Sequence, residues 1–492
     1  MPLNKNMTAI PHKILHTETN HYLYLPYNSR FYLIENGIMD ELTGFLDNYN
    51  QASKFTGSNH LRNFFNRYPE IPKAAESHQS FSYHNPVPTT GYREAVSDYL
   101  TSCVLCVTEQ CNLRCSYCCY SDHYSQTVPL SNSFMSEATA RQAVDFLYRH
   151  SRKSKDQLRL GFYGGEPMML YPLIRNTVSY AKTLFKNNIS FTMTTNATLL
   201  NQEKIDFLID NEFGLLISLD GDQVMTDRHR KYWKKEGSVF QDVVECARMI
   251  RNTDQEYFLN KVRFNSVLSG PLDFAAMEKA FVEEIGSRTI NVELANINPR
   301  HTDFFEHYPE ADQYDDDLAQ ARKRFYQSLV KGVEDDKNQS LPFYYFLNSQ
   351  TIRINKRTQL PIDECTPFPT GQCVPVVFQM YVRPEGDIYL CEKVDGSSSV
   401  GNIRDGIDIE AVESLFEPYY EEAKRTCRHC WVQRLCTVCV IRCENQGRFD
   451  PKMKQQACKS VRFHFKQSMT DYLQTLEKNP EAFDFLESWS FK

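Results

Sequence analysis

The spacing of the cysteines constrains the fold of this chain more than any other feature. The chain has 16 cysteines in 492 residues. Six lie between Cys103 and Cys119, nine lie between Cys365 and Cys458, and Cys246 stands alone. The N-terminus has no apolar export segment and the chain is long, so metal ligation explains the cysteines better than disulfides do. We therefore expect two metal-bearing regions, with an ordinary apolar core between them.

The composition limits the class of protein. Apolar residues make up 41% of the chain and charged residues 24%, which is typical of a globular protein of about three domains. The formal charge of −7 argues against a nucleic-acid partner, which would need a basic face. No segment approaches the roughly 20 apolar residues that would span a membrane. We expect a cytoplasmic protein with no nucleic-acid partner and no membrane partner.

The segment between the cysteine groups alternates short apolar runs with stretches of helical period. Runs rich in β-branched and aromatic residues are typical of strands that are buried on both faces. The six runs are 103–107, 158–163, 189–194, 213–219, 262–268 and 289–294. Among the helical stretches, one has Ala140, Val144 and Leu147 on one face, with Ser136 in position to cap it. This alternation predicts an α/β fold with a parallel sheet, either open or partly closed as a barrel.

The flanking segments differ from this core, which we place at residues 96–300. Residues 1–95 contain two expected strands and a helical stretch, which predict a small winged-helix-like α+β unit. Residues 301–360 predict a helical bridging region. Residues 361–470 have little periodicity, so we expect metal to hold them more than an apolar core does. Residues 471–492 would form a C-terminal helix and tail.

Cys111, Cys115 and Cys118 follow the first expected strand with the spacing C-x3-C-x2-C. Three thiolates at this spacing can converge on one metal site. A tetrahedral zinc site would need a fourth ligand, whereas a 4Fe–4S cluster held by three cysteines keeps one iron open. With Tyr117 before the third cysteine, the motif resembles that of the radical S-adenosylmethionine (SAM) enzymes.

Further motifs support this resemblance, because they lie at or near the carboxyl ends of expected strands, where ligands bind in α/β folds. The resemblance implies that these residues contact SAM. The residues are Tyr117, Gly164, Gly165, Glu166, Asn196, Ser218, Arg230 and Leu268.

The resemblance also implies individual roles. The glycines would let backbone approach the ligand, and Glu166 would accept a hydrogen bond from the amino group of SAM. Arg230 would pair with the SAM carboxylate, and Ser218 would contact the ribose and the methionine part. The backbone or the side chain of Tyr117 and of Leu268 would flank the adenine. The cysteines at 103, 106, 119 and 246 are expected to be bystanders.

The second cysteine group resembles the SPASM domain, which holds two auxiliary 4Fe–4S clusters. The resemblance assigns Cys365, Cys373, Cys391 and Cys439 to the first cluster. It assigns Cys427, Cys430, Cys436 and Cys458 to the second cluster. Nine cysteines leave one spare, and Cys443 is the alternative to Cys439. We favour Cys439, because CWVQRLCTVC resembles a variant found among thioether-forming maturases. A zinc site remains the alternative for this region.

Glu392 directly follows Cys391. Sulfatase-maturating relatives have an aspartate base at this place, so the resemblance makes Glu392 a candidate catalytic base. The alternative is a solvated surface glutamate.

Together these resemblances predict a radical SAM/SPASM maturase with three 4Fe–4S clusters and SAM as cofactors. A 5′-deoxyadenosyl radical would abstract hydrogen from a ribosomally made precursor peptide and yield a thioether, as in ranthipeptides or sactipeptides. The N-terminal unit resembles a RiPP recognition element, which binds a leader peptide as an added strand. A flavodoxin- or ferredoxin-type protein would supply electrons. The alternatives are a formylglycine-forming sulfatase-maturating enzyme, a carbon–carbon cross-linking enzyme, an RNA-modifying enzyme and a zinc scaffold.

Overall fold

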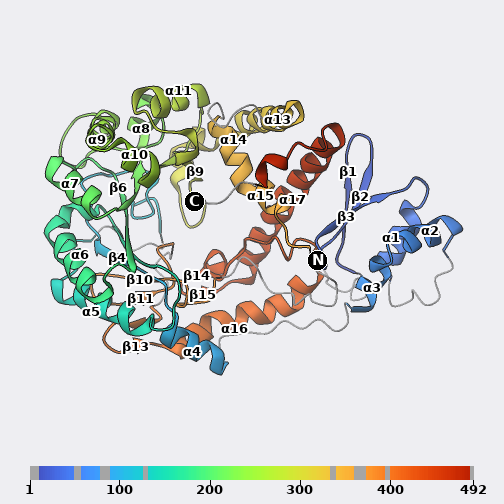
Figure 1. Cartoon of the computed structure of the whole chain (residues 1–492), viewed down its shortest axis with the longest axis horizontal. Helices are drawn as coiled ribbons and strands as arrows, with labels where there is room; N and C mark the ends of the chain where they lie inside the picture. The colour runs from blue at the N-terminus through green and yellow to red at the C-terminus, as the bar shows by residue number, and fades with distance from the viewer. Residues whose placement is uncertain are drawn as a thin grey trace.

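The computed structural model describes residues 10–48, 57–77, 89–125, 131–332, 340–359, 373–393 and 399–487 (Figure 1). Cys365, an expected ligand of the first auxiliary cluster, lies outside the described residues.

An eight-stranded sheet forms the core, with the strand order β11-β10-β4-β5-β6-β7-β8-β9. The pairings from β10 through β4 to β9 are all parallel, and β11 is antiparallel to β10. The six strands expected from the sequence are β4 (Ser102–Thr108), β5 (Leu158–Gly164), β6 (Ile189–Thr195), β7 (Gly214–Ser218), β8 (Val262–Leu268) and β9 (Val292–Asn296). The predicted α/β fold with a parallel sheet is therefore confirmed.

Helices connect these strands and bury the apolar faces that the sequence predicts. Ser136 caps the first helix, because its side chain accepts a hydrogen bond from the backbone N–H of Thr139. Ala140, Val144 and Leu147 of that helix are buried, as expected. The connecting helices are α5 (Glu137–His150), η3 (Pro167–Leu170), α6 (Tyr171–Phe185), α7 (Gln202–Asp210), α8 (Gln223–His229), α9 (Val239–Thr253), α10 (Gln255–Lys261), α11 (Phe274–Glu278), η4 (Lys279–Glu284) and η5 (Thr289–Asn291). In Figure 1, α5, α6, α7 and α9 lie along the outer side of the sheet.

The cysteine-rich region adds two strands to this sheet, which the sequence did not predict. β10 (Met380–Val382) pairs in parallel with Cys103–Leu105 of β4, and β11 (Ile388–Tyr389) forms the edge. All five residues of these two strands are buried. The expectation that metal more than an apolar core holds residues 361–470 is therefore wrong for this hairpin.

Helices dominate the remainder of the C-terminal half. The bridging region contains α12 (Phe304–His307), η6 (Pro309–Asp312), α13 (Asp315–Lys331), α14 (Leu341–Phe346), η8 (Leu347–Thr351) and α15 (Ile352–Asn355). Two long helices follow, α16 (Ile409–Thr426) and α17 (Pro451–Lys478), and α17 continues through position 470. Shorter elements lie around them, namely β12 (Gly401–Asn402), β13 (Gly406–Ile407), η10 (Cys427–His429), η11 (Val440–Cys443), β14 (Glu444–Asn445), β15 (Arg448–Phe449) and η12 (Asp484–Leu486).

The N-terminal unit is a three-stranded antiparallel sheet with helices on one side. The two expected strands are β2 (His21–Leu25) and β3 (Arg30–Ile34), and β1 (Lys13–His16) adds a third. α1 (Met39–Asp47), α2 (Asn59–Arg67) and α3 (Glu70–Ser77) follow, and α4 (Thr90–Asp98) leads to the core. Leu23, Ile34, Leu42 and Phe64 belong to a hydrophobic cluster that is separate from the main core.

The other face of this small sheet contacts the C-terminal helices rather than the parallel sheet (Figure 1). The rings of Tyr24 and Trp431 meet edge to face with centroids 6.4 Å apart. Arg434 donates to the carbonyl oxygen of Tyr27 at 2.8 Å, and Arg357 donates to that of Ser29 at 2.6 Å. The N-terminal unit is therefore anchored next to the second cysteine group.

A single acidic residue of α17 reinforces this contact. The carboxylate of Glu477 accepts hydrogen bonds from four side chains, those of Thr17, Thr19, Asn20 and Tyr22. Burial raises the pKa of Glu477, but these four hydrogen bonds outweigh it and hold the pKa below its usual value.

Across the described part of the chain, every helix is too short or too polar to cross a bilayer.

Candidate active site and auxiliary cysteine sites

A cavity of about 760 Å³ lies at the carboxyl ends of the parallel strands. Cys111, Cys115 and Cys118 line it together. Residues from the ends of the successive strands complete the wall, namely Gly164, Gly165, Thr195, Asn196, Ser218, Asn265, Val267, Ala295 and Asn296. The structure thus brings the expected cysteine trio and most of the expected SAM-binding residues to one place.

Backbone hydrogen bonds hold the cysteine loop against the segment that follows α8. The N–H of Arg114 donates to the carbonyl oxygen of Lys231 at 2.7 Å, and the N–H of Ser116 donates to that of His229 at 3.1 Å. The N–H of Trp233 donates back to Asn112 at 3.1 Å. This strand-like pairing fixes the path of the loop without any contribution from a metal.

The end of β5 carries the sequence Gly-Gly-Glu-Pro at residues 164–167, called the GGEP motif here. Its two glycines face the same loop from the other side. The N–H of Gly165 donates to the carbonyl oxygen of Thr108 at 2.8 Å. A Cβ atom at Gly165 would lie 2.1 Å from the carbonyl oxygen of Gln110, and one at Gly164, where φ is +127°, would lie 2.1 Å from that of Thr108. Glycine is needed here because the cysteine loop approaches so closely. The sequence predicted that glycine makes room for a ligand, and the structure adds this second reason.

Glu166 is fully buried and does not line the cavity. Its two carboxylate oxygens accept from Thr195 Oγ1 at 2.7 Å, from the N–H of Asn196 at 2.7 Å and from the N–H of Met168 at 3.0 Å. Burial raises the pKa of Glu166, and these hydrogen bonds oppose that effect. This placement does not favour the expected contact with the amino group of SAM. It gives Glu166 the role of positioning Asn196.

Asn196 connects that carboxylate to the cysteine loop. Its side-chain N–H group donates to Asn112 Oδ1 at 2.9 Å and approaches Cys111 Sγ at 3.7 Å. Asn112 in turn donates to Thr198 Oγ1 at 2.8 Å. The sequence named Asn196 without a role, and the structure places its amide beside the first sulfur of the trio.

Arg230 forms a buried ion pair with Asp220. Nε and Nη2 of Arg230 each donate to one carboxylate oxygen at 2.9 Å, and Tyr117 Oη also donates to this carboxylate. The N–H of Val267 donates to Asp220 at 3.0 Å. Both charged side chains are nearly inaccessible, so neither could be buried without the other. Arg230 lines the cavity beside Cys115, and its pairing with the carboxylate of SAM stays a prediction.

Two residues that hold the site together, Asp220 and His229, were not predicted from the sequence. Asp220 was not among the residues expected to bind SAM, although a carboxylate at a strand end ten residues before an arginine could have signalled the pair. His229 is buried and bonds Ser116 Oγ at 2.8 Å and Ser269 Oγ at 2.9 Å. Burial lowers the pKa of His229 to about 4, so the ring is neutral and holds the loop as a hydrogen-bonding group.

Ser218 lies on the cavity wall at the end of β7, as expected. Leu268 does not, because its side chain belongs to the buried core. Strand alternation gives the cavity position on β8 to its neighbour Val267. Tyr117 also lines the cavity, with its ring 5.5 Å from the guanidinium of Arg230.

The thiol trio fits an iron–sulfur cluster better than a zinc ion. A tetrahedral zinc–thiolate site requires sulfurs about 3.8 Å apart, given Zn–S bonds of about 2.3 Å. In the described part of the chain, no three cysteine sulfurs lie within 4.8 Å of one another. Burial raises the pKa of Cys111 and Cys115 to about 12, and the neighbouring thiols of the trio add to this. The trio is thus close enough to interact, yet spaced for a larger metal group.

The four cysteines expected to hold the second auxiliary cluster line one cavity of about 770 Å³ between η10 and α17. They are Cys427, Cys430, Cys436 and Cys458. Lys454 is almost fully buried beside them, and its ammonium group donates to Cys427 Sγ at 3.5 Å and to Thr426 Oγ1 at 2.9 Å. A buried cation is expected beside a group that carries several thiolates.

Three of the cysteines expected to hold the first auxiliary cluster also lie close together. Burial raises the pKa of the Cys373 and Cys391 thiols, and Cys439 raises both further. Cys443 instead is inaccessible, donates to the carbonyl oxygen of Cys439 at 3.3 Å and belongs to the main hydrophobic core. This arrangement favours Cys439 over Cys443 as the ligand.

Glu392 is close enough to Cys391 and to Tyr163 to act on both, although it does not itself line the cavity of the cysteine trio. It accepts a hydrogen bond from Gln379 at 2.6 Å and acts electrostatically on both Cys391 and Tyr163, which lines the cavity. Its role as a base stays a prediction.

Cys119, expected to be a bystander, also lines the cavity of the cysteine trio.

The remaining expected bystanders are buried. They are Cys103, Cys106 and Cys246.

Comparison with known proteins identifies the domain that carries the cavity. Residues 105–263 match the Radical SAM superfamily. An uncharacterized protein of Methanocaldococcus jannaschii is 25% identical over 309 residues, which are 63% of this chain and 90% of that protein. The cysteine-type anaerobic sulfatase-maturating enzyme of Clostridium novyi is 28% identical over 153 residues, 30% of this chain and 40% of the enzyme.

A solved structure of native anSMEcpe with bound AdoMet and Cp18Cys peptide has the same fold. The TM-score is 0.56 at 17% identity, and the match covers 79% of this chain and 99% of that one. The chain therefore contains a radical SAM domain, and the expectation of a radical SAM enzyme is confirmed. This fold implies a 4Fe–4S cluster and SAM as cofactors.

Replacement of Gly165 by alanine should disrupt the cysteine trio. The added Cβ would collide with the backbone at Gln110, so we expect the free energy of unfolding to fall by about 1–3 kcal/mol. Iron content should fall by about four atoms per chain. Gly44→Ala is the control, because position 44 lies inside α1 with no atom within 4 Å. Wild-type iron content and wild-type SAM cleavage in Gly165→Ala would contradict the proposed packing role.

Substitutions at Cys439 and Cys443 separate the two candidate ligands. Cys439→Ala should lower the iron content of anoxically prepared protein, because it removes a sulfur that lies near Cys373 and Cys391. Cys443→Ala should leave the iron content unchanged and cause only a small loss of stability. Iron analysis together with thermal unfolding measures both effects, and the opposite pattern would assign the ligand to Cys443.

Proposed function

We propose that this radical SAM enzyme modifies a ribosomally synthesised precursor peptide and forms sulfur-to-carbon thioether links in it. The proposal rests mainly on the position of the cysteine-rich region. Because β10 pairs with β4, Cys391 and Glu392 are held close to the cavity that contains the cysteine trio. A substrate in the cavity could then reach both sites.

The residues of the cavity are suited to hold a zwitterionic cofactor. Cys111, Cys115 and Cys118 would hold a 4Fe–4S cluster, and Arg230, fixed by Asp220, would meet the carboxylate of SAM. When bound, this cluster and SAM supply a carbon-centred radical that removes a hydrogen atom from the substrate. Ser218 and Asn196 would orient SAM, and the buried walls would exclude water and protect the radical from side reactions.

Formation of a thioether removes one C–H hydrogen and one S–H proton from the peptide and creates a C–S bond. The C–H hydrogen leaves as an atom to the SAM-derived radical, and Glu392 would accept the thiol proton. The remaining electron requires an acceptor, and we assign that role to the two auxiliary 4Fe–4S sites. A flavodoxin- or ferredoxin-type reductant stays a prediction.

The N-terminal unit is suited to bind the leader part of such a peptide. Within the described residues, β1 and β3 pair only with β2, so both edges of this sheet can accept another strand. Leu33 of β3 is 43% exposed, so this edge strand presents a large apolar side chain to solvent. A peptide strand placed beside β3 would cover it.

Formylglycine formation on a sulfatase is the second candidate function. The similarity to the Clostridium novyi enzyme and the fold shared with anSMEcpe favour it. This reaction needs no leader peptide, so the two candidates differ in their dependence on the N-terminal unit. Deleting residues 1–90 would not separate them cleanly, because Leu15 and Tyr24 belong to the main core.

The thioether reaction has a direct test. Co-expression with a Cys-containing peptide encoded next to this gene should give a product that is lighter by two hydrogen atoms for each link. Mass spectrometry after alkylation should find one thiol fewer for each link. A peptide of unchanged mass, with every thiol still open to alkylation, would rule out thioether formation.

Leader binding can be tested with a point substitution. Leu33→Asp should weaken the binding of a fluorescently labelled leader peptide to the full chain by about tenfold, the equivalent of about 1.4 kcal/mol. Val282→Asp is the matched control, because Val282 is 42% exposed on a helix outside the N-terminal unit. Fluorescence anisotropy measures both affinities. Equal affinities for the two variants and the unaltered chain would remove β3 as the leader site.

A further inference from the structure

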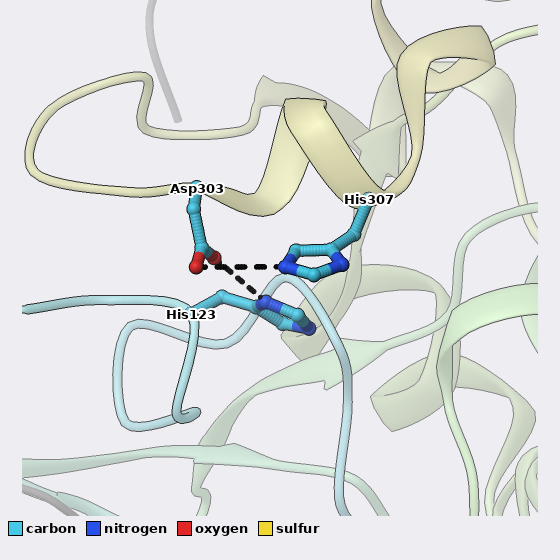
Figure 2. A group of neighbouring side chains, drawn as sticks. All are labelled: His123, Asp303 and His307. Atoms are coloured by element: carbon cyan, nitrogen blue, oxygen red, sulfur yellow. Dashed lines mark hydrogen bonds and ion pairs between the residues drawn. The ribbon is translucent and has the colours of Figure 1, made fainter.

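A second group of side chains that could bind a metal lies at the rim of the cavity that contains Cys111, Cys115 and Cys118. His123 belongs to the loop that follows the third cysteine, whereas Asp303 and His307 lie at the two ends of α12 (Figure 2). Their ligand atoms all lie within 4.8 Å of one another, which no three cysteine sulfurs achieve in the described part of the chain. His123 also lines the cavity, so this group borders the radical SAM site without belonging to it.

We propose that His123, Asp303 and His307 bind a divalent transition-metal ion of the Zn²⁺ type. Two imidazoles and one carboxylate form a donor set that suits zinc and its first-row neighbours rather than magnesium or calcium. Three protein ligands leave at least one coordination position open for water or for a substrate group.

The ligand atoms of the three side chains lie close enough to one another to bind the same ion. His123 Nδ1 lies 2.8 Å from Asp303 Oδ1, and His307 Nε2 lies 3.5 Å from Asp303 Oδ2. Figure 2 shows the carboxylate beside both rings, with one imidazole on each oxygen. In the described chain the carboxylate has no lysine or arginine partner, so no fixed cation competes with a metal.

The backbone holds the two segments in register. The N–H of Asp303 donates to the carbonyl oxygen of His123 at 3.1 Å, and the N–H of Ser125 donates to that of His301 at 2.9 Å. Tyr124 and Thr302 form a β-bridge between these bonds. The site is therefore built on a fixed pairing of two segments that are far apart in the sequence.

Aromatic packing below the site orients the first imidazole. The ring of His123 meets the fully buried ring of Phe304 edge to face at 6.1 Å and the ring of Tyr308 at 5.8 Å. The side chain of His123 is 24% exposed, whereas those of Asp303 and His307 are 49% and 58% exposed. An ion could therefore enter from solvent and find one ligand already oriented.

A bound ion would tie the loop after the cysteine trio to α12. Of these two segments, the loop lines the cavity, through Ser121, Asp122 and His123. The site would thus brace the entrance, and its open position could accept a thiolate or carboxylate of an incoming substrate. Metal binding by these three residues does not require the proposed peptide chemistry, so a failure of one would not imply a failure of the other.

Zinc binding to the cluster-loaded holoprotein tests the proposal. Equilibrium dialysis against Zn²⁺ under anoxic conditions should find one more zinc per chain in the unaltered protein than in a His123→Ala/His307→Ala variant. Asp303→Asn should weaken this binding by at least about tenfold. That substitution keeps the side-chain shape, and Asp303 makes no capping hydrogen bond to α12, so the helix should persist.

His60→Ala is the matched control, because His60 is an exposed histidine on α2, far from the site in the sequence and outside the group. It should bind zinc as the unaltered protein does. Iron content measured in the same samples reports whether the clusters and the fold are retained. Equal zinc stoichiometry and affinity in the unaltered protein, the double variant and Asp303→Asn would overturn the proposal.

Discussion

The backbone pairing of the cysteine loop is the constraint on which the site depends. On one side, the loop bonds the segment after α8, and on the other side the GGEP turn bonds Thr108 and Gln110. Burial of Cys111 and Cys115 is unfavourable for the thiolate forms that a metal needs, as the raised pKa values of these two thiols indicate. The backbone hydrogen bonds on both sides of the loop offset part of this cost, because they fix the path of the chain that carries the thiols.

The same constraint explains which features the sequence could reveal. The six parallel strands were predictable because each contains a short apolar run that is followed by a stretch of helical period, and the cysteine trio because its spacing is distinctive. The strands β1 and β10 were not predictable, because four or three residues carry no recognisable period. Their pairing partners lie in contacts that only the folded chain creates.

The SAM-binding motifs show a similar division. The sequence placed these motifs correctly at the strand ends, but it did not indicate the direction in which each side chain points. Glu166 turns inward to hold Asn196, and Leu268 turns into the core while Val267 meets the cavity. Asp220 was not expected to have a role, because its position ten residues before Arg230 shows that the two could pair but not that they do. Side-chain direction and pairing belong to tertiary structure, and spacing alone does not encode them.

The contact between the N-terminal unit and the second auxiliary site connects two parts that sequence reasoning kept separate. Trp431 follows Cys430 directly, and it meets Tyr24 of β2, while Arg434 bonds the turn between β2 and β3. The CW-x4-C-x2-C stretch, which suggested thioether chemistry, is therefore also the stretch that anchors the small sheet. A substitution at Trp431 acts on both, so the resemblance carried by this tryptophan does not by itself indicate a reaction. Glu392 provides a more direct indication, because it follows Cys391 and acts electrostatically on Tyr163, which lines the cavity of the cysteine trio.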